Sequence, residues 1–286
     1  MIIGYTLGDQ AGIGPEVIEA ALQSSSLSPD VEYRLIGSAI PAIPGHPSHD
    51  TAQAAFEHLE LAAQTLKEGR IDAIVTGPVC KEGLHEVGFT WPGQTEFFAE
   101  RLNTPNYAMC LSGAHLTVAL ATIHTSLSSV PQLLNTHELV RIGTLLADFL
   151  RRMGKAAPRI ALAGLNPHAG EHGAFGHEEE TIIAPAVAQL NEMKSIATFY
   201  GPEVPDAVYR ATINGQFDGI LAPYHDQGLI PLKMVDFDTA VNITLGLPRP
   251  RVSPDHGTAF GIAGQKIANP ASMIRAFHVA SLMAQQ

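Results

Sequence analysis

Apolar runs of strand length alternate along the chain with longer segments in which apolar residues recur at helical spacing. This alternation predicts an α/β fold with mostly parallel strands. Segment 107–123 departs from it, because Ser112-Gly113-Ala114 joins two strand-like runs and so predicts an antiparallel hairpin. The candidate strands are 2–7, 33–37, 71–76, 107–111, 116–123, 159–164, 196–199, 218–222 and 240–245. The candidate helices are 15–23, 50–68, 94–102, 136–153, 178–193, 205–215 and 270–284.

The composition is that of a soluble globular protein. At 286 residues the chain is long enough for one large domain or two smaller ones. Hydrophobic residues make up 45% of it and charged residues 16%, which argues against a disordered protein. The formal net charge of −11 argues against nucleic acid or an anionic membrane as the main partner. An anionic small substrate stays possible, because local positive groups can override the global sign.

Neither a membrane span nor a secretory segment is expected. No apolar run reaches the roughly 18–20 residues of a span, and a strand-like segment opens the chain with no basic region before it. Cys80 and Cys110 form neither a disulfide framework nor a zinc-ribbon spacing, which is typical of reduced thiols. We therefore expect a cytoplasmic protein. The Pro- and Gly-rich segment 38–50 predicts a surface loop in which His46 and His49 are solvated.

Three histidines follow strand-like runs in distant parts of the chain. They are His124, His168 and His225. Ligands bind just beyond the carboxyl ends of parallel strands, so these imidazoles suggest a metal site with open positions. A lone histidine at a strand end is more often structural, and the spacing has no local signature, so both interpretations stay open. His172 and His177 lie in a Gly-rich loop without a preceding strand and are expected to be solvated.

Two turns after strands could approach a ligand. Gly8–Glu16 joins a strand to a helix, and its glycines allow close backbone approach. It is not a dinucleotide fingerprint, because Val17 occupies the last glycine position, and it could equally be a tight turn. Thr76–Lys81 also follows a strand, and Lys81 is either solvated or directed into a cleft. At the helix start near residue 94, Thr95 suits either a phosphate oxygen or an ordinary N-cap.

Positive and polar groups gather near the end of this acidic chain. Lys233, Asn242, Arg249 and Arg251 provide what anion capture requires. The segment Asp255-His256-Gly257-Thr258-Ala259 follows them, and Ala268-Asn269-Pro270 comes shortly after.

Motifs throughout the chain resemble those of the 4-hydroxythreonine-4-phosphate dehydrogenase family of vitamin B6 biosynthesis. In family order, they are Gly-Asp-x-Ala-Gly-Ile-Gly-Pro-Glu, Thr-Gly-Pro-x-x-Lys, Asn-Pro-His-Ala-Gly-Glu, Tyr-His-Asp-Gln-Gly, Val-Asn-Ile-Thr-Leu-Gly-Leu-Pro and Asp-His-Gly-Thr-Ala. The closing His-Gly-Thr-Ala stretch is also similar to isocitrate and isopropylmalate dehydrogenases, where it wraps the adenosine half of the nicotinamide cofactor.

The resemblance implies an α/β fold of two α/β/α domains with mixed, mostly parallel sheets and an interdomain cleft. The N- and C-terminal parts share one domain, so we expect a cofactor domain of residues 1–92 plus 252–286. Residues 93–251 would form the metal, substrate and dimerisation domain. The resemblance further implies a homodimer with the metal site at the subunit interface.

The same resemblance assigns roles to residues. It implies one divalent ion (zinc, magnesium or cobalt) on His124, His168 and His225, and NAD or NADP as the redox cofactor. It makes Lys233 and His225 catalytic, although sequence cannot tell whether Lys233 holds an anionic group or relays a proton. The implied substrate contacts are Gln94, Thr95, Lys233, Asn242 and Arg251. The implied cofactor contacts are Asp255, His256, Gly257, Thr258 and Asn269.

The implied activity is oxidation and decarboxylation of 4-phosphooxy-L-threonine to 3-amino-2-oxopropyl phosphate. Three departures from the family pattern bear on it: Gln94 replaces the usual histidine, Gln10 replaces a proline, and the Ser38–Asp50 region is shorter than usual. In addition, Gly261 stands where the related isocitrate and isopropylmalate dehydrogenases place an acidic residue that holds the adenosine ribose. Gln94 leaves open a paralogous dehydrogenase of phosphorylated threonate or erythronate. Gly261 favours a relaxed choice between NAD and NADP. A phosphate acyltransferase of similar fold is a weaker alternative, because it needs neither the histidines nor the adenosine segment.

Overall fold

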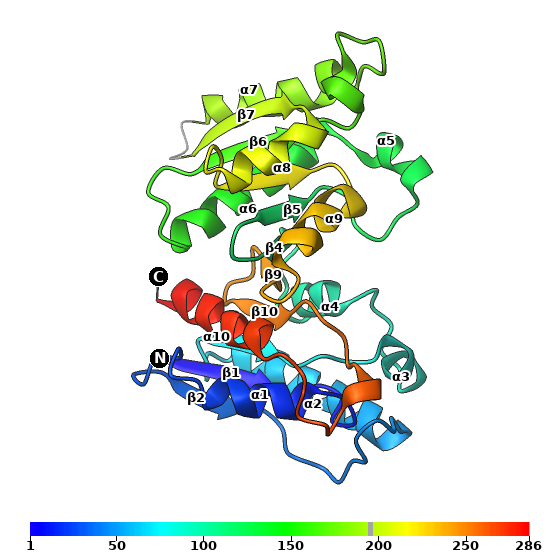
Figure 1. Cartoon of the computed structure of the whole chain (residues 1–286), viewed down its shortest axis with the longest axis vertical. Coiled ribbons are helices and arrows are strands. Elements are labelled where there is room, and N and C mark those ends of the chain that lie inside the picture. The colour runs from blue at the N-terminus through cyan, green and yellow to red at the C-terminus, as the bar shows by residue number, and fades with distance from the viewer. Residues whose placement is uncertain (194–196, 286) are drawn as a thin grey trace. The chain divides into compact units, whose positions relative to one another are not determined.

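The computed structural model describes residues 1–193 and 197–285, and it divides into two compact units (Figure 1). Unit 1 comprises Met1–Pro105 and Asp238–Gln286, and unit 2 comprises Asn106–Phe237. The chain therefore crosses between the units twice. The boundaries lie at 105/106 and 237/238, whereas the sequence suggested 92/93 and 251/252. Residues 93–105 belong to unit 1 because the fully buried ring of Phe97 packs edge-on against Phe56 of the same unit.

The sheet of unit 1 has the strand order β2-β1-β3-β10-β9. Its strands are β1 (Ile2–Thr6), β2 (Glu32–Leu35), β3 (Ala73–Thr76), β9 (Val241–Leu245) and β10 (Arg251–Pro254). The first four in spatial order run parallel, and β9 is antiparallel to β10. Every residue of β3 and β10 is buried, as expected for strands covered on both faces.

The helices of unit 1 pack with this sheet in two groups. Helices α1 and α10 contact each other, and α2 contacts β1, β3 and α3. Their bounds are α1 (Gly14–Leu22), α2 (His49–Lys67), α3 (Lys81–Glu86), α4 (Gln94–Arg101), the short η4 (Phe260–Ile262) and α10 (Ala271–Ala284). Ser48 begins α2 with a capping box, so the preceding loop ends one residue before His49.

The sheet of unit 2 has the order β4-β5-β8-β6-β7. The predicted hairpin is confirmed, because β4 and β5 pair antiparallel, while β5, β8, β6 and β7 run parallel. The strands are β4 (Ala108–Ser112), β5 (Thr117–Leu120), β6 (Arg159–Ala163), β7 (Thr198–Glu203) and β8 (Gly219–Ala222). The candidate strand 196–199 thus corresponds to β7, although residue 196 lies outside the described residues.

The helices of unit 2 include one that the sequence did not predict. Helix α9 begins at His225, where Pro-Tyr-His-Asp-Gln-Gly predicted a polar turn. Gly228 and Pro231 hide the helical pattern, but the glycine is needed, because a Cβ there would lie 2.7 Å from the Leu120 side chain of β5. The bounds are η1 (Leu127–Ser129), α5 (Val130–Leu133), α6 (Thr136–Arg152), η2 (Pro167–Gly170), η3 (Glu179–Ile183), α7 (Ala184–Glu192), α8 (Pro205–Ile213) and α9 (His225–Asp236).

Strand β10 was also missed, because prolines at positions 248 and 250 interrupt the apolar pattern that precedes it. No helix in the described part of the chain is both long and apolar enough to cross a membrane.

Candidate functional site

A buried guanidinium organises the polar residues of unit 1. Arg251 on β10 is only 2% exposed. Its Nη2 donates to Gln94 Oε1 at the start of α4 and to Thr76 Oγ1 at the end of β3, both at 2.8 Å. Its Nη1 lies 3.5 Å from Asn242 Oδ1 on β9. The structure therefore brings together the predicted contacts Gln94, Asn242 and Arg251.

Thr95 lies in the same cluster and does not cap the helix. Gly93 is the N-cap of α4 and Gln94 is the first residue of the helix, so Thr95 is the second helical residue. Its side chain is buried, and its Oγ1 accepts a long hydrogen bond of 3.4 Å from Thr244 Oγ1. The alternative of an ordinary threonine N-cap is therefore excluded.

The charge of Arg251 is poorly compensated. Burial lowers the pKa of Arg251 to about 9, and the nearby Glu96 carboxylate opposes that shift. Within residues 1–193 and 197–285, no carboxylate comes within ion-pair distance of the guanidinium, and its Nε finds no hydrogen-bond partner. A buried cation that has lost its hydration and gained only neutral hydrogen-bond acceptors favours the approach of an anion.

Two of the three predicted metal histidines lie together in unit 2. The rings of His124, just after β5, and His225, the first residue of α9, have centroids 6.0 Å apart. They line a hollow of about 460 Å³ together with Tyr224 and Asp226. Asp226 Oδ1 lies 2.7 Å from His225 Nδ1, so it orients the imidazole and leaves Nε2 for another partner.

His168 lies elsewhere in unit 2, on an exposed loop. Its side chain is 69% exposed and borders a separate hollow of about 330 Å³. Residues 168–173 all have positive φ, a left-handed run that is costly for residues other than glycine. Within the described residues of this single chain, no three His, Cys, Asp or Glu side chains are grouped so that they could hold a metal. The chain alone thus brings together two imidazoles of the predicted three.

A buried carboxylate holds the His168 loop. Glu179, 2% exposed, accepts hydrogen bonds from the Asn166 backbone N–H at 2.7 Å and from its side-chain Nδ2 at 3.0 Å. Asn166 Nδ2 also donates to Glu178 Oε2 at 2.8 Å, and hydrogen bonds lower the pKa of Glu178. Sequence reasoning did not identify these hydrogen bonds of Asn166 with Glu178 and Glu179.

The two lysines occupy different settings. Lys233 is half-buried on α9, two turns beyond His225. The end of that helix is fixed by Asp236, whose buried carboxylate accepts from the backbone N–H groups of His115 and Leu116 in the β4–β5 hairpin, each at 2.9 Å. Lys81 is exposed as the first residue of the short helix α3. Lys233 therefore sits on an anchored helix, whereas Lys81 is solvated.

The predicted cofactor segment joins β10 to α10 and rests on the first turn of unit 1. Ile13 N–H donates to the Thr258 carbonyl at 2.9 Å. A Cβ on Gly12 would lie 2.7 Å from that oxygen, so the close approach requires glycine. Asn269 Oδ1 accepts from the Ala271 N–H at 3.0 Å and so caps the entry to α10.

The same segment retains features that suit a ligand. His256 Nε2 is buried without a hydrogen-bond partner among the described residues. Around Gly257 and Gly261, nothing lies within 4 Å of the position that a Cβ would take. An unpaired ring nitrogen and unfilled space beside glycines fit the binding of a polar cofactor.

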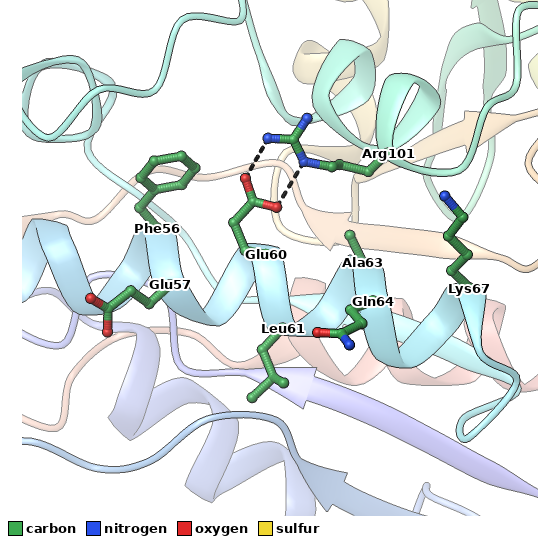
Figure 2. Close-up of a pocket in the computed structure, with 8 residues that line it drawn as sticks. All are labelled: Phe56, Glu57, Glu60, Leu61, Ala63, Gln64, Lys67 and Arg101. Carbon is green, nitrogen blue, oxygen red and sulfur yellow. Dashed lines mark hydrogen bonds and ion pairs between the residues drawn. The ribbon is translucent and has the colours of Figure 1, made fainter.

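A further hollow, of about 610 Å³, runs along α2 and contains none of the predicted site residues (Figure 2). Two of its charges compensate each other, because Arg101 binds both carboxylate oxygens of Glu60. The guanidinium also stacks 4.6 Å from the Trp91 ring. These contacts raise the pKa of Arg101, mainly through the hydrogen bond to Glu60. The other cation that lines this hollow, Lys67, is exposed, so among the lining residues there is no buried charge comparable to Arg251.

Some residues at these sites were not assigned from sequence. Thr76, Glu96 and Asp226 touch or face the predicted site residues, although all three lie inside motifs visible in the sequence. The position of Thr76 at a strand end was the signal that could have identified it.

Comparisons with known proteins agree with the resemblance. The family model described as pyridoxal phosphate biosynthetic protein PdxA matches residues 15–280. A 4-hydroxythreonine-4-phosphate dehydrogenase of Erythrobacter litoralis is 40% identical over 324 positions, covering 97% of this chain and 95% of that protein. A D-threonate 4-phosphate dehydrogenase of Pectobacterium atrosepticum is 37% identical over 325 positions and covers 99% of both. Both alignments exceed the 286 residues of the chain, so the relatives contain segments that it lacks.

Solved structures extend the comparison. A 4-hydroxythreonine-4-phosphate dehydrogenase from Klebsiella pneumoniae matches with a TM-score of 0.81 at 36% identity, covering 99% of both chains. An isocitrate dehydrogenase from Methylococcus capsulatus matches with a TM-score of 0.54 at 15% identity, covering 99% of this chain and 85% of that one, which concerns the fold alone. The predicted isocitrate dehydrogenase-like α/β fold is thereby confirmed. From its family-model match and its full-length relatives, the chain belongs to the PdxA family of pyridoxal phosphate biosynthetic proteins.

Proposed function

We propose that this protein is a metal- and NAD(P)-dependent 4-hydroxythreonine-4-phosphate dehydrogenase. It would oxidise and decarboxylate 4-phosphooxy-L-threonine to 3-amino-2-oxopropyl phosphate. The observation that carries the proposal is the buried guanidinium of Arg251, which has no ion-paired carboxylate and is surrounded by hydroxyl and amide groups, in a chain whose curated relatives reported above are named for phosphorylated substrates.

The phosphate binds to unit 1 in this proposal. Arg251 supplies a charge and a planar fork of donors that matches two phosphate oxygens. The Thr95 hydroxyl and the Gln94 and Asn242 amides supply further hydrogen bonds from α4 and β9. A phosphate dianion would replace the hydration that Arg251 has lost, so the cost of burying the guanidinium is recovered when the substrate binds.

The metal binds to unit 2. His124 and His225 supply two ligands from each chain, and we infer that His168 of the partner subunit supplies the third. When bound, a zinc, magnesium or cobalt ion would polarise the substrate hydroxyl and then the keto oxygen as a Lewis acid. Helix α9, which carries His225, exposes an apolar stripe at helical spacing: Ile230 is 60%, Met234 82% and Phe237 71% exposed. Such a stripe favours a protein partner and supports a homodimer.

The cofactor binds to unit 1. Asp255, His256, Gly257 and Thr258 would line the adenosine half, and Asn269 would close the segment. His256 Nε2 would donate to or accept from the ligand at the position where it now lacks a partner. NAD or NADP would accept the hydride.

The proposed reaction has two steps, an oxidation and a decarboxylation. The substrate carbon that bears the hydroxyl loses hydride, and the hydroxyl loses a proton, which gives a β-keto acid. The carbon–carbon bond to the carboxylate breaks, carbon dioxide departs, and the resulting enol takes up a proton at carbon. Lys233, half-buried and firmly positioned on α9, would hold the substrate carboxylate or carry one of these protons.

A second candidate substrate is phosphorylated threonate or a related sugar acid. Gln94 favours it, because a glutamine donates a hydrogen bond to phosphate but cannot carry the charge of the histidine usual there. The relative from Pectobacterium atrosepticum that is named D-threonate 4-phosphate dehydrogenase is only slightly less similar than those named for 4-hydroxythreonine phosphate.

An assay of reduced nicotinamide formation tests the proposal. The purified protein is given NAD or NADP with either 4-phosphooxy-threonine or phosphothreonate, before and after treatment with a chelator. We expect turnover that disappears with the chelator and returns with a divalent ion. Absence of reduction with both substrates would overturn the dehydrogenase assignment, and activity that survives complete metal removal would overturn the metal's role. The larger kcat/KM identifies the substrate.

A further inference from the structure

Gln10 fastens a distant loop to the first turn of unit 1. Its side chain is only 7% exposed. The Nε2 group donates to the Ser38 carbonyl at 2.9 Å, and Oε1 accepts from the Ile40 N–H at 3.0 Å. Both ends of the carboxamide are thus used to hold one backbone segment. The proline usual at this position in the family could form neither bond.

The loop that Gln10 holds also forms a hydrogen-bonded turn at its tip, and this tip is bonded to the first turn of unit 1. Ile43 to His46 form a turn in which His46 N–H donates to the Ile43 carbonyl at 3.0 Å. Pro44 and Gly45 are its central residues, and Gly45 has φ +82°, the arrangement of a type II turn. Gly45 N–H donates to the Ala11 carbonyl at 2.8 Å. The loop is therefore fixed at its base by Gln10 and at its tip by Ala11.

The loop lies directly against the predicted cofactor segment. A Cβ on Gly45 would lie 3.1 Å from the Phe260 carbonyl, and a Cβ on Gly264 would lie 2.8 Å from the Pro44 side chain. The turn that holds the loop also holds this segment, through the bond from Ile13 N–H to the Thr258 carbonyl. Anything that moves the loop would therefore change the surroundings of residues 258–264.

Each of these two segments exposes one large apolar side chain. Ile43 at the loop tip is 69% exposed, and Ile267, three residues beyond Gly264, is 66% exposed. A preformed turn that presents an isoleucine to water gains free energy when a flat aromatic group covers it. The adenine ring is such a group in the cofactor that this segment would bind.

We propose that Gln10 is a positioning residue that holds the loop around Ile43 as one wall of the adenosine site, with Ile43 as an apolar contact for adenine. This inference rests on the proposed function, because it requires residues 255–269 to bind the adenosine half of NAD(P). It assigns a purpose to a glutamine and to a short loop that distinguish this chain from the family pattern.

Binding of ADP-ribose, which contains the adenosine half and no redox centre, tests the inference by calorimetry. Gln10→Met removes both hydrogen bonds of the side-chain amide and keeps an unbranched side chain. It should weaken ADP-ribose binding about tenfold, as expected for two lost hydrogen bonds. Ile43→Ser should weaken it about fivefold through lost apolar contact. Gln10→Glu keeps the acceptor for Ile40 but places a buried carboxylate oxygen against the Ser38 carbonyl, so its effect should be at least as large as that of Gln10→Met. In turnover assays, KM for NAD(P) should rise while kcat and KM for the phosphorylated substrate stay unchanged.

Matched controls separate this role from general stability. Gln64→Met changes an exposed glutamine of α2, and Ile213→Ser changes an exposed isoleucine of α8, so neither should alter ADP-ribose binding. If the wild type binds ADP-ribose and the Gln10 and Ile43 variants bind it equally well, the inference is wrong and the proposed function stands. If the wild type does not bind ADP-ribose, both the inference and the cofactor assignment are wrong. Equal loss of affinity for ADP-ribose and for inorganic phosphate would indicate a global disturbance and would also overturn the inference. Should Gln10→Met fail to fold, the surface variant Ile43→Ser decides.

Discussion

Replacing Arg251 by methionine should stabilise the ligand-free protein while removing its affinity for phosphate. The guanidinium is 2% exposed, and burial lowers its pKa to about 9. Methionine has a similar length and no charge, so it can occupy the same buried path across Phe98, whose ring centre lies 5.8 Å from the guanidinium carbon. The variant therefore removes the charge with little change in packing.

The magnitude follows from opposing contributions. A pKa lowered to about 9 corresponds to a penalty on the order of 5 kcal/mol for keeping the guanidinium charged in the fold, at about 1.4 kcal/mol per pKa unit. Loss of the bonds to Thr76, Gln94 and Asn242 costs about 1 kcal/mol each. The free energy of unfolding should therefore rise by about 2 kcal/mol in the absence of anions. Because charge-assisted bonds contribute roughly 1.5–3 kcal/mol each, kcat/KM should fall about a thousandfold.

The stabilisation should depend on pH in a defined direction. A cation whose pKa is lowered by folding destabilises the fold fully below the folded pKa, and the penalty is relieved as the pH rises through it. The stability advantage of Arg251→Met should therefore be constant at neutral pH and decrease above pH 9. Phosphate affinity of the wild type should also decrease above that pH, because the guanidinium loses its charge.

Urea unfolding with and without inorganic phosphate measures both effects, and Arg101→Met is the matched control. Arg101 binds both oxygens of Glu60 (Figure 2), and the hydrogen bond to Glu60 raises rather than lowers its pKa. Its guanidinium also stacks on the Trp91 ring. Its loss should lower the free energy of unfolding by about 1 kcal/mol and leave phosphate stabilisation intact. The reasoning would be refuted if Arg251→Met were destabilised like the control or were still stabilised by phosphate.

Four further outcomes follow from the structure. Gln94→His, which restores the residue usual in the family, should raise kcat/KM for 4-phosphooxy-threonine relative to phosphothreonate, and an unchanged ratio would remove Gln94 as a determinant of the substrate. His225→Ala should lose bound metal and turnover but keep its circular dichroism spectrum, whereas the exposed His172→Ala should keep all three; metal retained at full occupancy would exclude His225 as a ligand. Glu179→Ala should lower the free energy of unfolding by about 2 kcal/mol, because it removes the buried acceptor of two hydrogen bonds from the half-buried Asn166, and a change below the error of urea titration would contradict the role of Glu179. The space around Gly261 should let NAD and NADP react with KM values within about tenfold of each other, so a large advantage for NAD would refute relaxed cofactor choice.

Strand ends were the part of this molecule that could be predicted from the sequence. His124, Thr76 and His225 each follow an apolar run, and each run forms a buried strand of a mostly parallel sheet. An apolar run is a local property of the sequence, so it can be recognised without knowledge of the fold. The hairpin was equally visible, because a glycine-containing turn joined two such runs.

Other features depend on contacts that no local pattern contains. Helix α9 was hidden because Gly228 breaks the helical signal, and only the packing of that glycine on Leu120 explains its presence. The pairing of Arg251 with Thr76 joins residues far apart in the chain. The fastening role of Gln10 could not be foreseen either, because its partners are backbone atoms, which every sequence contains.

In the proposed function, the apolar stripe on α9 and the separation of His168 from the other two histidines would both be explained by a homodimer. Ile230 and Met234 lie on the helix that begins with His225, and Phe237 directly follows its end, so a partner that covers the stripe also lies against the helix that carries that imidazole. Asp236 holds the C-terminal end of this helix to the β4–β5 hairpin, and Asp226 orients the His225 ring at its start. His168, in contrast, lies on an exposed loop whose left-handed backbone is maintained by a buried carboxylate. The His168 loop is exposed and firmly held, so it is suited to insert into a neighbouring molecule. Helix α9 is anchored and exposes an apolar stripe, so it is suited to contact such a loop. Dimerisation and metal binding would then depend on each other, because each subunit would complete the set of ligands that its partner begins.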